Sequence, residues 1–376
     1  MKRQTEKFWG KVVTFSLFCS CFLTGLKQVE AKEKEAKVSV LFTHDMHSHL
    51  NNFSTMFEGE KKNVGGFSRI KTIIDEKRAK NSDLLLLDGG DFSMGTLFQT
   101  IYESEASELR MLGYMGYDAT TLGNHEFDYR TEGICNMLRA AENNKSTLPQ
   151  MVLCNVDWSS DLNEEQKELK RAFEDYGIKK YIVLEKSGVR IAILGVFGKD
   201  SLACAPTCAL KFKDPVQAVR ETVAEIRDKE EVDMILALSH SGTWENAKNS
   251  EDEILAKEVP ELDLIVSAHT HTVLDEPIIH GDTAIVSAGE YGMRVGSLDM
   301  VRKKDGRWKI ENYELIPVTE DIVPNPVIQE KIDGFEKDID KKYLSQFGYT
   351  ADQVLAYSNF NFATINEMYN VHEEHG

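Results

Sequence analysis

Basic residues are the minority in this chain. Its 376 residues include 44 lysines and arginines against 62 aspartates and glutamates, a formal net charge of −18 at neutral pH. A protein that binds a nucleic-acid polymer needs a basic surface to neutralise the phosphates. DNA and RNA are therefore not expected partners. Small phosphorylated molecules remain possible partners, because metal ions in a site can reverse the local electric field.

Cysteine is also scarce, with six residues in the whole chain. Outside the N-terminal segment, four remain: Cys135, Cys154, Cys204 and Cys208. They are too few for a disulfide scaffold and are not spaced as paired zinc clips. We expect Cys135 and Cys154 to be buried free thiols. We expect Cys204 and Cys208 to form a short-loop disulfide, which an oxidising compartment would permit.

Long hydrophobic runs are absent apart from one at the N-terminus. The apolar stretch 12–26 follows several basic residues and precedes a small-residue pattern that ends at Ala31. It is shorter than the roughly 20 residues that span a bilayer as a helix. This organisation is typical of a secretory signal peptide. We expect cleavage of residues 1–31, no stable transmembrane anchor, and a secreted or extracytoplasmic protein in the cell envelope or periplasm.

The rest of the chain alternates strand-like and helix-like segments, which predicts an α/β domain. The amphipathic segments expected to be helices are 67–78, 103–112, 133–142 and 216–229. From residue 276 the pattern changes to successive strands at 278–280, 284–287, 295–301 and 308–315. The last two should pair across the Asp305-Gly306 turn. Apolar residues at helical spacing over 328–343 predict one more helix, which ends at Gly348.

Side chains that bind metals follow five of the apolar runs. The runs are 38–42, 84–87, 119–122, 234–238 and 262–266. The side chains are Asp45, His47, Asp91, Asn124, His240, His269 and His271. Imidazoles combined with carboxylates and one amide suit Zn, Mn, Fe or Co better than Ca. The pattern predicts a site for two divalent metal ions at the edge where the strands end.

Individual motifs indicate individual roles. Asp45 and His47 are separated by one residue, so an extended backbone would place both on the same side to chelate one ion. Asp91 follows two glycines that let the backbone approach an ion, and it is the candidate to bridge two ions. His44 and His49 flank the first motif, and either could support a ligand or be structural.

The segment 123–128, which reads Gly-Asn-His-Glu-Phe-Asp, is the most specific signal in the chain. It supplies the amide of Asn124, the imidazole of His125 and, three residues later, the carboxylate of Asp128. Such a carboxylate holds an imidazole in one tautomer and favours its protonated form. His125 would then neutralise phosphate charge or protonate a leaving oxygen. His125 and Asp128 are the candidate catalytic pair.

The order of these motifs resembles the calcineurin-like metallophosphoesterase superfamily, and within it the secreted bacterial 5'-nucleotidase and 2',3'-cyclic phosphodiesterase family. The resemblance covers about residues 38–317. It implies an α/β fold, a β-sandwich of mixed sheets flanked by helices in four layers (α-β-β-α), as a catalytic domain at 37–320. It implies a linker helix at 324–348. The tail 349–376 resembles the start of a C-terminal nucleotidase domain that is missing here, and Phe360 and Phe362 in it are more typical of core residues than of a stacking platform.

The same resemblance implies how the ligands are shared. One ion would be held by Asp45, His47, Asp91 and His271. The second would be held by Asp91, Asn124, His240 and His269. Asn124, His125 and Asn155 would contact the substrate. The implied reaction is hydrolysis of 5'-nucleotides by metal-activated hydroxide. The alternatives are a 2',3'-cyclic nucleotide phosphodiesterase, another phosphomonoesterase, or a non-catalytic secreted binding protein on the same scaffold.

Two residues depart from the family pattern. Ala268 stands where the family usually has glycine, and His271 occupies a ligand position that is often glutamine in nucleotidases. Neither change removes a ligand. The departures therefore bear on the choice of nucleotide more than on hydrolysis.

Overall fold

The computed structural model describes residues 36–144 and 147–359. The predicted signal peptide at 1–31 and the aromatic residues Phe360 and Phe362 lie outside the described residues. Among the helices of the described part, none combines the length and the apolar composition needed to cross a membrane.

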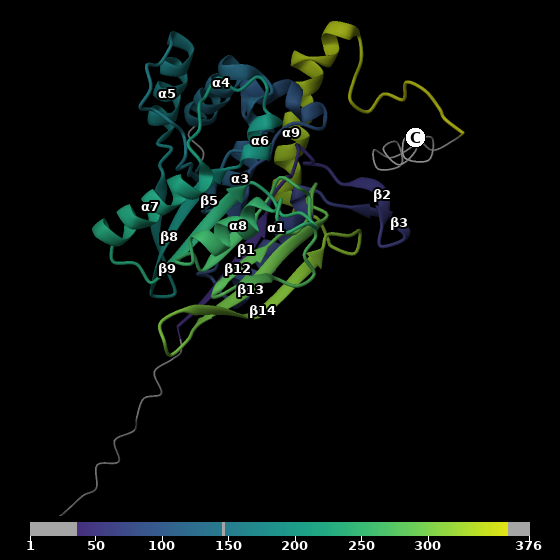
Figure 1. The fold of residues 1–376 in the computed structure, drawn as a ribbon. Helices are drawn as coiled ribbons and strands as arrows, with labels where there is room; N and C mark the ends of the chain where they lie inside the picture. The colour runs from purple at the N-terminus through teal and green to yellow at the C-terminus, as the bar shows by residue number, and fades with distance from the viewer. Residues whose placement is uncertain (1–35, 145–146, 360–376) are drawn as a thin grey trace, which may run out of the picture. The chain divides into compact units, whose positions relative to one another are not determined.

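The first of two six-stranded sheets has the strand order β14-β13-β1-β4-β5-β6. Its long strands β13 and β14 lie side by side (Figure 1). Its strands are β1 (Lys37–Thr43), β4 (Leu85–Asp88), β5 (Ala119–Thr120), β6 (Gln150–Met151), β13 (Arg294–Arg302) and β14 (Trp308–Pro317). The neighbouring strands β1, β4, β5 and β6 pair in parallel, whereas β13 pairs antiparallel with both β1 and β14. The sheet is therefore mixed, and the predicted pairing across Asp305-Gly306 is confirmed.

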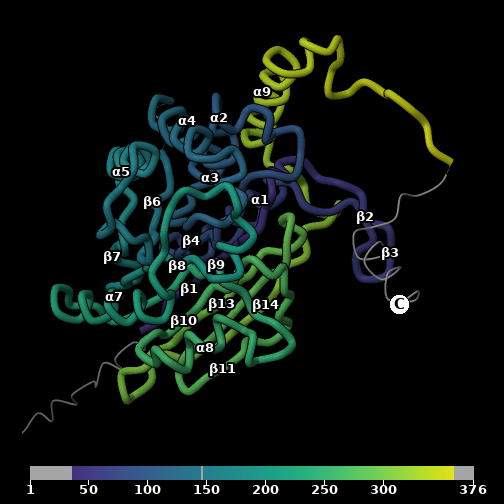
Figure 2. The backbone as a smooth tube through the Cα atoms, turned by 45° about the horizontal axis from the view of Figure 1, so that its top comes forward, coloured from purple at the N-terminus to yellow at the C-terminus, as the bar shows by residue number. Residues whose placement is uncertain are grey.

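The second sheet has the order β11-β12-β10-β9-β8-β7. Its strands are β7 (Tyr181–Lys186), β8 (Val189–Phe197), β9 (Met234–His240), β10 (Leu264–Ser267), β11 (Ile278–His280) and β12 (Thr283–Val286). The four inner strands are parallel, and antiparallel strands close both edges. A separate hairpin, β2 (Phe53–Phe57) and β3 (Glu60–Val64), projects from the side of the fold (Figure 2).

Alternate side chains of the strands divide the core into three buried layers. Val40 of β1, Ile193 of β8 and Leu236 of β9 belong to the cluster between the two sheets. Leu41 and Leu86 face the opposite way, into a cluster with α1 (Phe67–Lys80), α3 (Ser107–Met115), α4 (Arg130–Asn143), α5 (Glu164–Tyr176) and α9 (Pro326–Lys342). The outer face of the second sheet packs against α7 (Pro215–Lys229) and α8 (Glu251–Glu258). This confirms the predicted four-layer fold.

Several elements differ from the sequence prediction. The expected helix 103–112 is split into α2 (Tyr102–Glu105) and α3, because Ala106 adopts the left-handed conformation with φ 47°. The helices α5 and α8 and the β7–β8 hairpin were not predicted. The capping box of Asn163 and Gln166 at the start of α5 was a readable signal for that helix.

The predicted helix after Pro326 is confirmed as α9. Its apolar face, Ile328, Ile332, Phe335 and Ile339, is buried against the core of the first sheet. A short 3₁₀ helix, η3 (Leu344–Phe347), follows and ends at Gly348 in the left-handed conformation. Residues 354–357 form no strand in the described part of the chain, and Tyr357 is 93% exposed.

The predicted disulfide is wrong, because Cys204 and Cys208 are both free thiols. The sulfur of Cys204 lies near Asp200 and His269. Cys208 instead packs against the hydrophobic core. The two side chains therefore lie in different environments, although only three residues separate them in the sequence. The prediction of buried free thiols at Cys135 and Cys154 is confirmed.

Candidate metal centre

The predicted ligands meet at the ends of strands from both sheets. In the first sheet β1 leads to Asp45 and β4 leads to Asp91. In the second sheet β9 ends at His240 and β10 leads to His269. Because parallel strands present their carboxyl ends at one edge of a sheet, loops from both sheets converge on one place.

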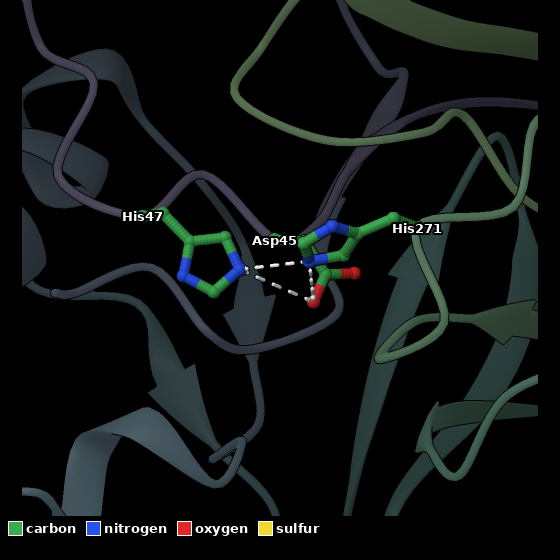
Figure 3. Close-up of side chains that lie close together, drawn as sticks. All are labelled: Asp45, His47 and His271. Atoms are coloured by element: carbon green, nitrogen blue, oxygen red, sulfur yellow. Dashed lines mark hydrogen bonds and ion pairs between the residues drawn. The ribbon is translucent and has the colours of Figure 1, made fainter. Parts of the chain in front are cut away.

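The first cluster consists of Asp45, His47 and His271 (Figure 3). The Nε2 atoms of the two imidazoles lie 2.9 Å apart. Asp45 Oδ1 lies 3.8 Å from the Nε2 of His47 and 3.6 Å from that of His271. Three ligand atoms from loops of both sheets are thus directed at one point, as a metal ion requires.

The second cluster consists of Asp91, His240 and His269. Asp91 Oδ2 lies 3.1 Å from His240 Nε2 and 3.9 Å from His47 Nε2, so this carboxylate stands between the two clusters. Its position fits the bridging role that the sequence predicts. His240 donates from Nδ1 to the carbonyl of Gly89 at 2.9 Å, which turns its Nε2 into the cluster.

The buried Oδ1 of Asn124, near Asp91, has no hydrogen-bond partner among the described residues. The buried Nε2 of His240 makes no well-formed hydrogen bond there either, although it lies 3.1 Å from Asp91 Oδ2 as an ion pair. A buried polar atom without a partner carries a desolvation cost of about 1–3 kcal/mol. A divalent cation would satisfy both, so the residues present fit the metal that the sequence predicts.

Backbone conformation distinguishes these loops from the rest of the fold. Five of the seven predicted ligands have left-handed φ values between 45° and 80°: Asp45, His47, Asp91, His269 and His271. This conformation is uncommon in residues other than glycine and costs of order 1–3 kcal/mol each. Such residues concentrate at functional sites, because surrounding structure must hold them in place.

His44, which the sequence left open, supports a ligand. Its Nε2 accepts from the backbone N–H of Ala288 at 2.7 Å, which leaves Nδ1 to donate to Asp45 Oδ2 at 2.6 Å. Burial raises the pKa of Asp45, but the His44 hydrogen bond and the charge of His240 outweigh burial and lower it to about 2. Asp45 therefore stays ionised and oriented.

Glu126 is a buried residue of this centre that we did not predict. Its carboxylate accepts from the backbone N–H of Asp91 at 3.0 Å, of Ser93 at 3.1 Å and of Gly123 at 2.6 Å. The Ser93 hydroxyl donates to it as well, at 2.7 Å. Glu126 thus ties the Asp91 loop to the Asn124 loop. Its place in the specific 123–128 motif was the available signal.

Replacing Glu126 with alanine is expected to lower the free energy of unfolding by about 3 kcal/mol or more, because three buried N–H groups lose their acceptor. Chemical denaturation monitored by circular dichroism measures this change. Glu132→Ala is the control, since Glu132 is exposed on α4. Equal midpoints for the two variants would contradict the role of Glu126 as a tie between the loops.

Because Gly123 has no side chain, Asp91 and His240 can pack closely against its backbone. A Cβ atom at residue 123 would lie 2.1 Å from Asp91 Oδ1 and 2.6 Å from His240 Cε1. Gly123→Ala should therefore displace the bridging carboxylate and reduce the metal content, with an overpacking cost of about 1–3 kcal/mol. Metal analysis after gel filtration measures the loss. Gly334→Ala is the matched control, because no atom lies within 4 Å of its Cβ position.

The predicted pair His125 and Asp128 lies at the exposed rim of the centre. His125 Nδ1 donates to Asp128 Oδ2 at 2.8 Å, and the two side chains are 39% and 40% exposed. The backbone N–H of His125 donates to Asp91 Oδ1 at 2.8 Å. Burial lowers the pKa of His125, but Asp128 and Asp91 outweigh the effect of burial and raise this pKa to about 9. The ring therefore carries positive charge beside the ligands.

Asn155 is the most buried of the predicted substrate contacts. Its side chain is fully buried, and its amide exchanges two hydrogen bonds with the backbone of Phe197, at 2.8 and 3.0 Å. Asn155 thus holds the end of β8 in place. Its contact with a substrate stays a prediction.

The part of the chain that carries these residues is similar to known proteins. A family model described as calcineurin-like phosphoesterase matches residues 38–273. The chain is 29% identical over 337 residues to the trifunctional nucleotide phosphoesterase protein YfkN of Bacillus subtilis, covering 83% of this chain and 21% of that protein. It is 29% identical over 328 residues to a 5'-nucleotidase of Vibrio cholerae, covering 79% of this chain and 54% of that one.

A solved structure agrees with these sequence matches. The 5'-nucleotidase precursor of Thermus thermophilus superimposes with a TM-score of 0.67 at 26% identity, over 81% of this chain and 59% of that one. The chain thus spans about half the length of the 5'-nucleotidases it matches.

Proposed function

The chain belongs to the calcineurin-like phosphoesterase family, and from this premise we propose that it is a metal-dependent phosphoesterase that hydrolyses 5'-nucleotides. The observation that carries the proposal is the pair of ligand clusters joined by Asp91, with two buried polar atoms beside it left without hydrogen bonds. Nucleotides are the proposed substrates because relatives along most of this chain carry the name 5'-nucleotidase.

Two divalent ions fit the donor set. Asp45, His47, Asp91 and His271 would hold one, and Asp91, Asn124, His240 and His269 would hold the other. Ions in such a centre acidify a bound water and neutralise charge on phosphate oxygens. Zn, Mn, Fe and Co all suit a set of imidazoles and carboxylates with one amide.

The protonation states of the ligands suit this arrangement. Burial lowers the pKa of His47 and of His269, and it lowers that of His271 to about 4. These imidazoles are therefore neutral, which is the form that binds metal. Burial also lowers the pKa of His240, but the charge of Asp91 outweighs it and raises it to about 10. A cation in the second cluster would take the place of the His240 proton.

His125 supplies the chemistry of the chain itself. Asp128 occupies its Nδ1, so Nε2 is left to face an oxygen of the substrate. From there the charged ring would stabilise negative charge on the phosphoryl group and give a proton to the leaving oxygen. Glu126 and His44 keep Asp91 and Asp45 in position during the reaction.

The proposal includes a location and a domain plan. We propose that residues 1–31 direct the protein to an extracytoplasmic compartment, that 37–320 form the catalytic domain, and that 324–348 is a linker helix. The buried face of α9 supports a fixed attachment of this helix to the catalytic domain.

Phosphate release tests the function directly. The purified protein should release phosphate from 5'-nucleotides after loading with Mn, Zn or Co, and release should stop after chelation. A 2',3'-cyclic nucleotide and p-nitrophenyl phosphate in the same panel distinguish a nucleotidase from a cyclic phosphodiesterase or a general phosphomonoesterase. No release from any substrate by a folded, metal-loaded protein would favour a binding protein on the same scaffold.

A further inference from the structure

Another cluster of metal-ligand side chains lies on the solvent side of His269. Asp200, Cys204 and His269 each offer a ligand atom, and the three atoms lie within 4.8 Å of one another. Asp200 Oδ2 is 2.8 Å from His269 Nε2. The Asp200 side chain is 46% exposed and Cys204 is exposed, whereas Asp91 and His240 are buried. A cation could reach this outer cluster from solvent.

The segment that carries Asp200 and Cys204 is held firmly. The short helix α6 (Lys199–Ala203) is tied to the end of β9, because Gly198 N–H and the Ser201 hydroxyl both donate to the carbonyl of His240, at 2.9 and 2.6 Å. The Glu251 carboxylate accepts from the backbone N–H of Asp200 at 2.9 Å. The Cys204 N–H donates to the carbonyl of Asp200 at 2.9 Å. The outer cluster is thus formed before any ion arrives.

The donor set selects a particular kind of ion. One sulfur, one imidazole nitrogen and one carboxylate oxygen form a set that zinc uses, with a fourth position open to water. Sulfur favours Zn²⁺ and similar thiophilic ions over Mg²⁺, Ca²⁺ and Mn²⁺, which prefer oxygen. Cys204 is available for this, since its thiol is free and exposed.

We propose that Asp200, Cys204 and His269 bind a thiophilic divalent cation such as Zn²⁺ at a site outside the two-ion centre. The proposal goes beyond phosphoester hydrolysis and shares only His269 with that centre. Because His269 belongs to both clusters, an ion at the outer site competes with the second ion of the centre for this ligand. Excess zinc should therefore slow the enzyme through Cys204.

Cobalt absorption tests the site. Co²⁺ is titrated into the chelator-treated protein under a reductant that does not bind metals, and thiolate-to-cobalt charge transfer is followed in the near ultraviolet. The band should appear in the unaltered protein and in Cys208→Ser, and it should be lost in Cys204→Ser. Cys208→Ser is the matched control, because it removes the neighbouring thiol without touching the cluster.

Thiol alkylation provides a second readout. Zinc at about ten times its dissociation constant should slow alkylation of Cys204 about tenfold, because protection follows the fraction bound. In Asp200→Asn, about ten times more zinc should be needed to give Cys204 the same protection. Inhibition by excess zinc should likewise be reduced in Cys204→Ser.

A charge-transfer band that survives Cys204→Ser, or no band at any cobalt concentration, would overturn the proposal. So would a purified protein in which mass spectrometry finds Cys204 and Cys208 joined as a disulfide. These readouts do not depend on phosphate release. An inactive protein that shows the band would contradict the proposed enzyme activity and leave the outer site supported.

Discussion

Replacing Asp91 with asparagine should reduce phosphate release by about 10³-fold or more while the chain stays folded. Asp91 lies within 4 Å of imidazoles in both clusters, so its loss removes the shared negative charge from both proposed ions. Asparagine keeps the side-chain oxygen that accepts from His125 N–H. The expected loss is therefore electrostatic rather than steric.

The measurement combines initial rates with metal analysis of the same sample. The metal content should fall below that of the unaltered protein, and circular dichroism should be unchanged. Asp161→Asn is the control, because Asp161 is exposed and remote in sequence from every ligand. Full activity in Asp91→Asn would remove the basis for a centre joined by this carboxylate.

Replacing His125 with glutamine should slow hydrolysis of a 5'-nucleotide by about 10²-fold or more while both ions stay bound. The leaving group of a nucleotide is a poor one that needs a proton, and His125 is the charged ring at the rim that can give it. Asp128→Asn should have a smaller effect in the same direction, because it removes the negative charge that favours the protonated ring but leaves an oxygen that can accept from Nδ1.

The leaving group separates proton donation from simple charge stabilisation. p-Nitrophenolate departs without a proton, so His125→Gln should slow p-nitrophenyl phosphate much less than the nucleotide. His280→Gln is the control, because His280 on β11 pairs with Glu253 of α8, outside the ligand clusters. Equal losses for both substrates would show that His125 acts through its charge alone.

Much of the fold and of the ligand set was predictable because the signals are local. The seven ligands lie at or within a few residues of the ends of five strands, and parallel strands bring such positions to one edge. The four-layer arrangement and the family resemblance predicted from the motif order are confirmed by the structure and by the family model. The ligand assignments themselves stay predictions until metal binding is measured.

The supporting residues were not predictable because their partners are distant in the sequence. His44 contacts Ser287, 243 residues away, and Glu126 contacts the N–H of Asp91, 35 residues away. The 123–128 motif marks Glu126 but does not reveal which distant N–H groups its carboxylate binds. The Cys204–Cys208 prediction failed for a related reason, since short spacing does not reveal which way each side chain turns.

Backbone conformation was also hidden from the sequence. Left-handed residues are usually recognised by glycine, but aspartate and histidine occupy these positions in the ligand loops. The same holds for Ala106, which splits the expected helix without a glycine or proline.

Because loops from both sheets converge at the site, an ion bound there would also cross-link the two sheets. His47 and His271 meet although 224 residues separate them in the chain. An ion bound to both closes a very long loop, and closing such a loop removes conformational entropy that unfolding would otherwise release. Because the unfolded chain has no assembled site, ion binding adds to the free energy of folding in proportion to the logarithm of ion concentration. Chelation should therefore loosen the rim that joins the two sheets and lower the melting temperature of the whole domain.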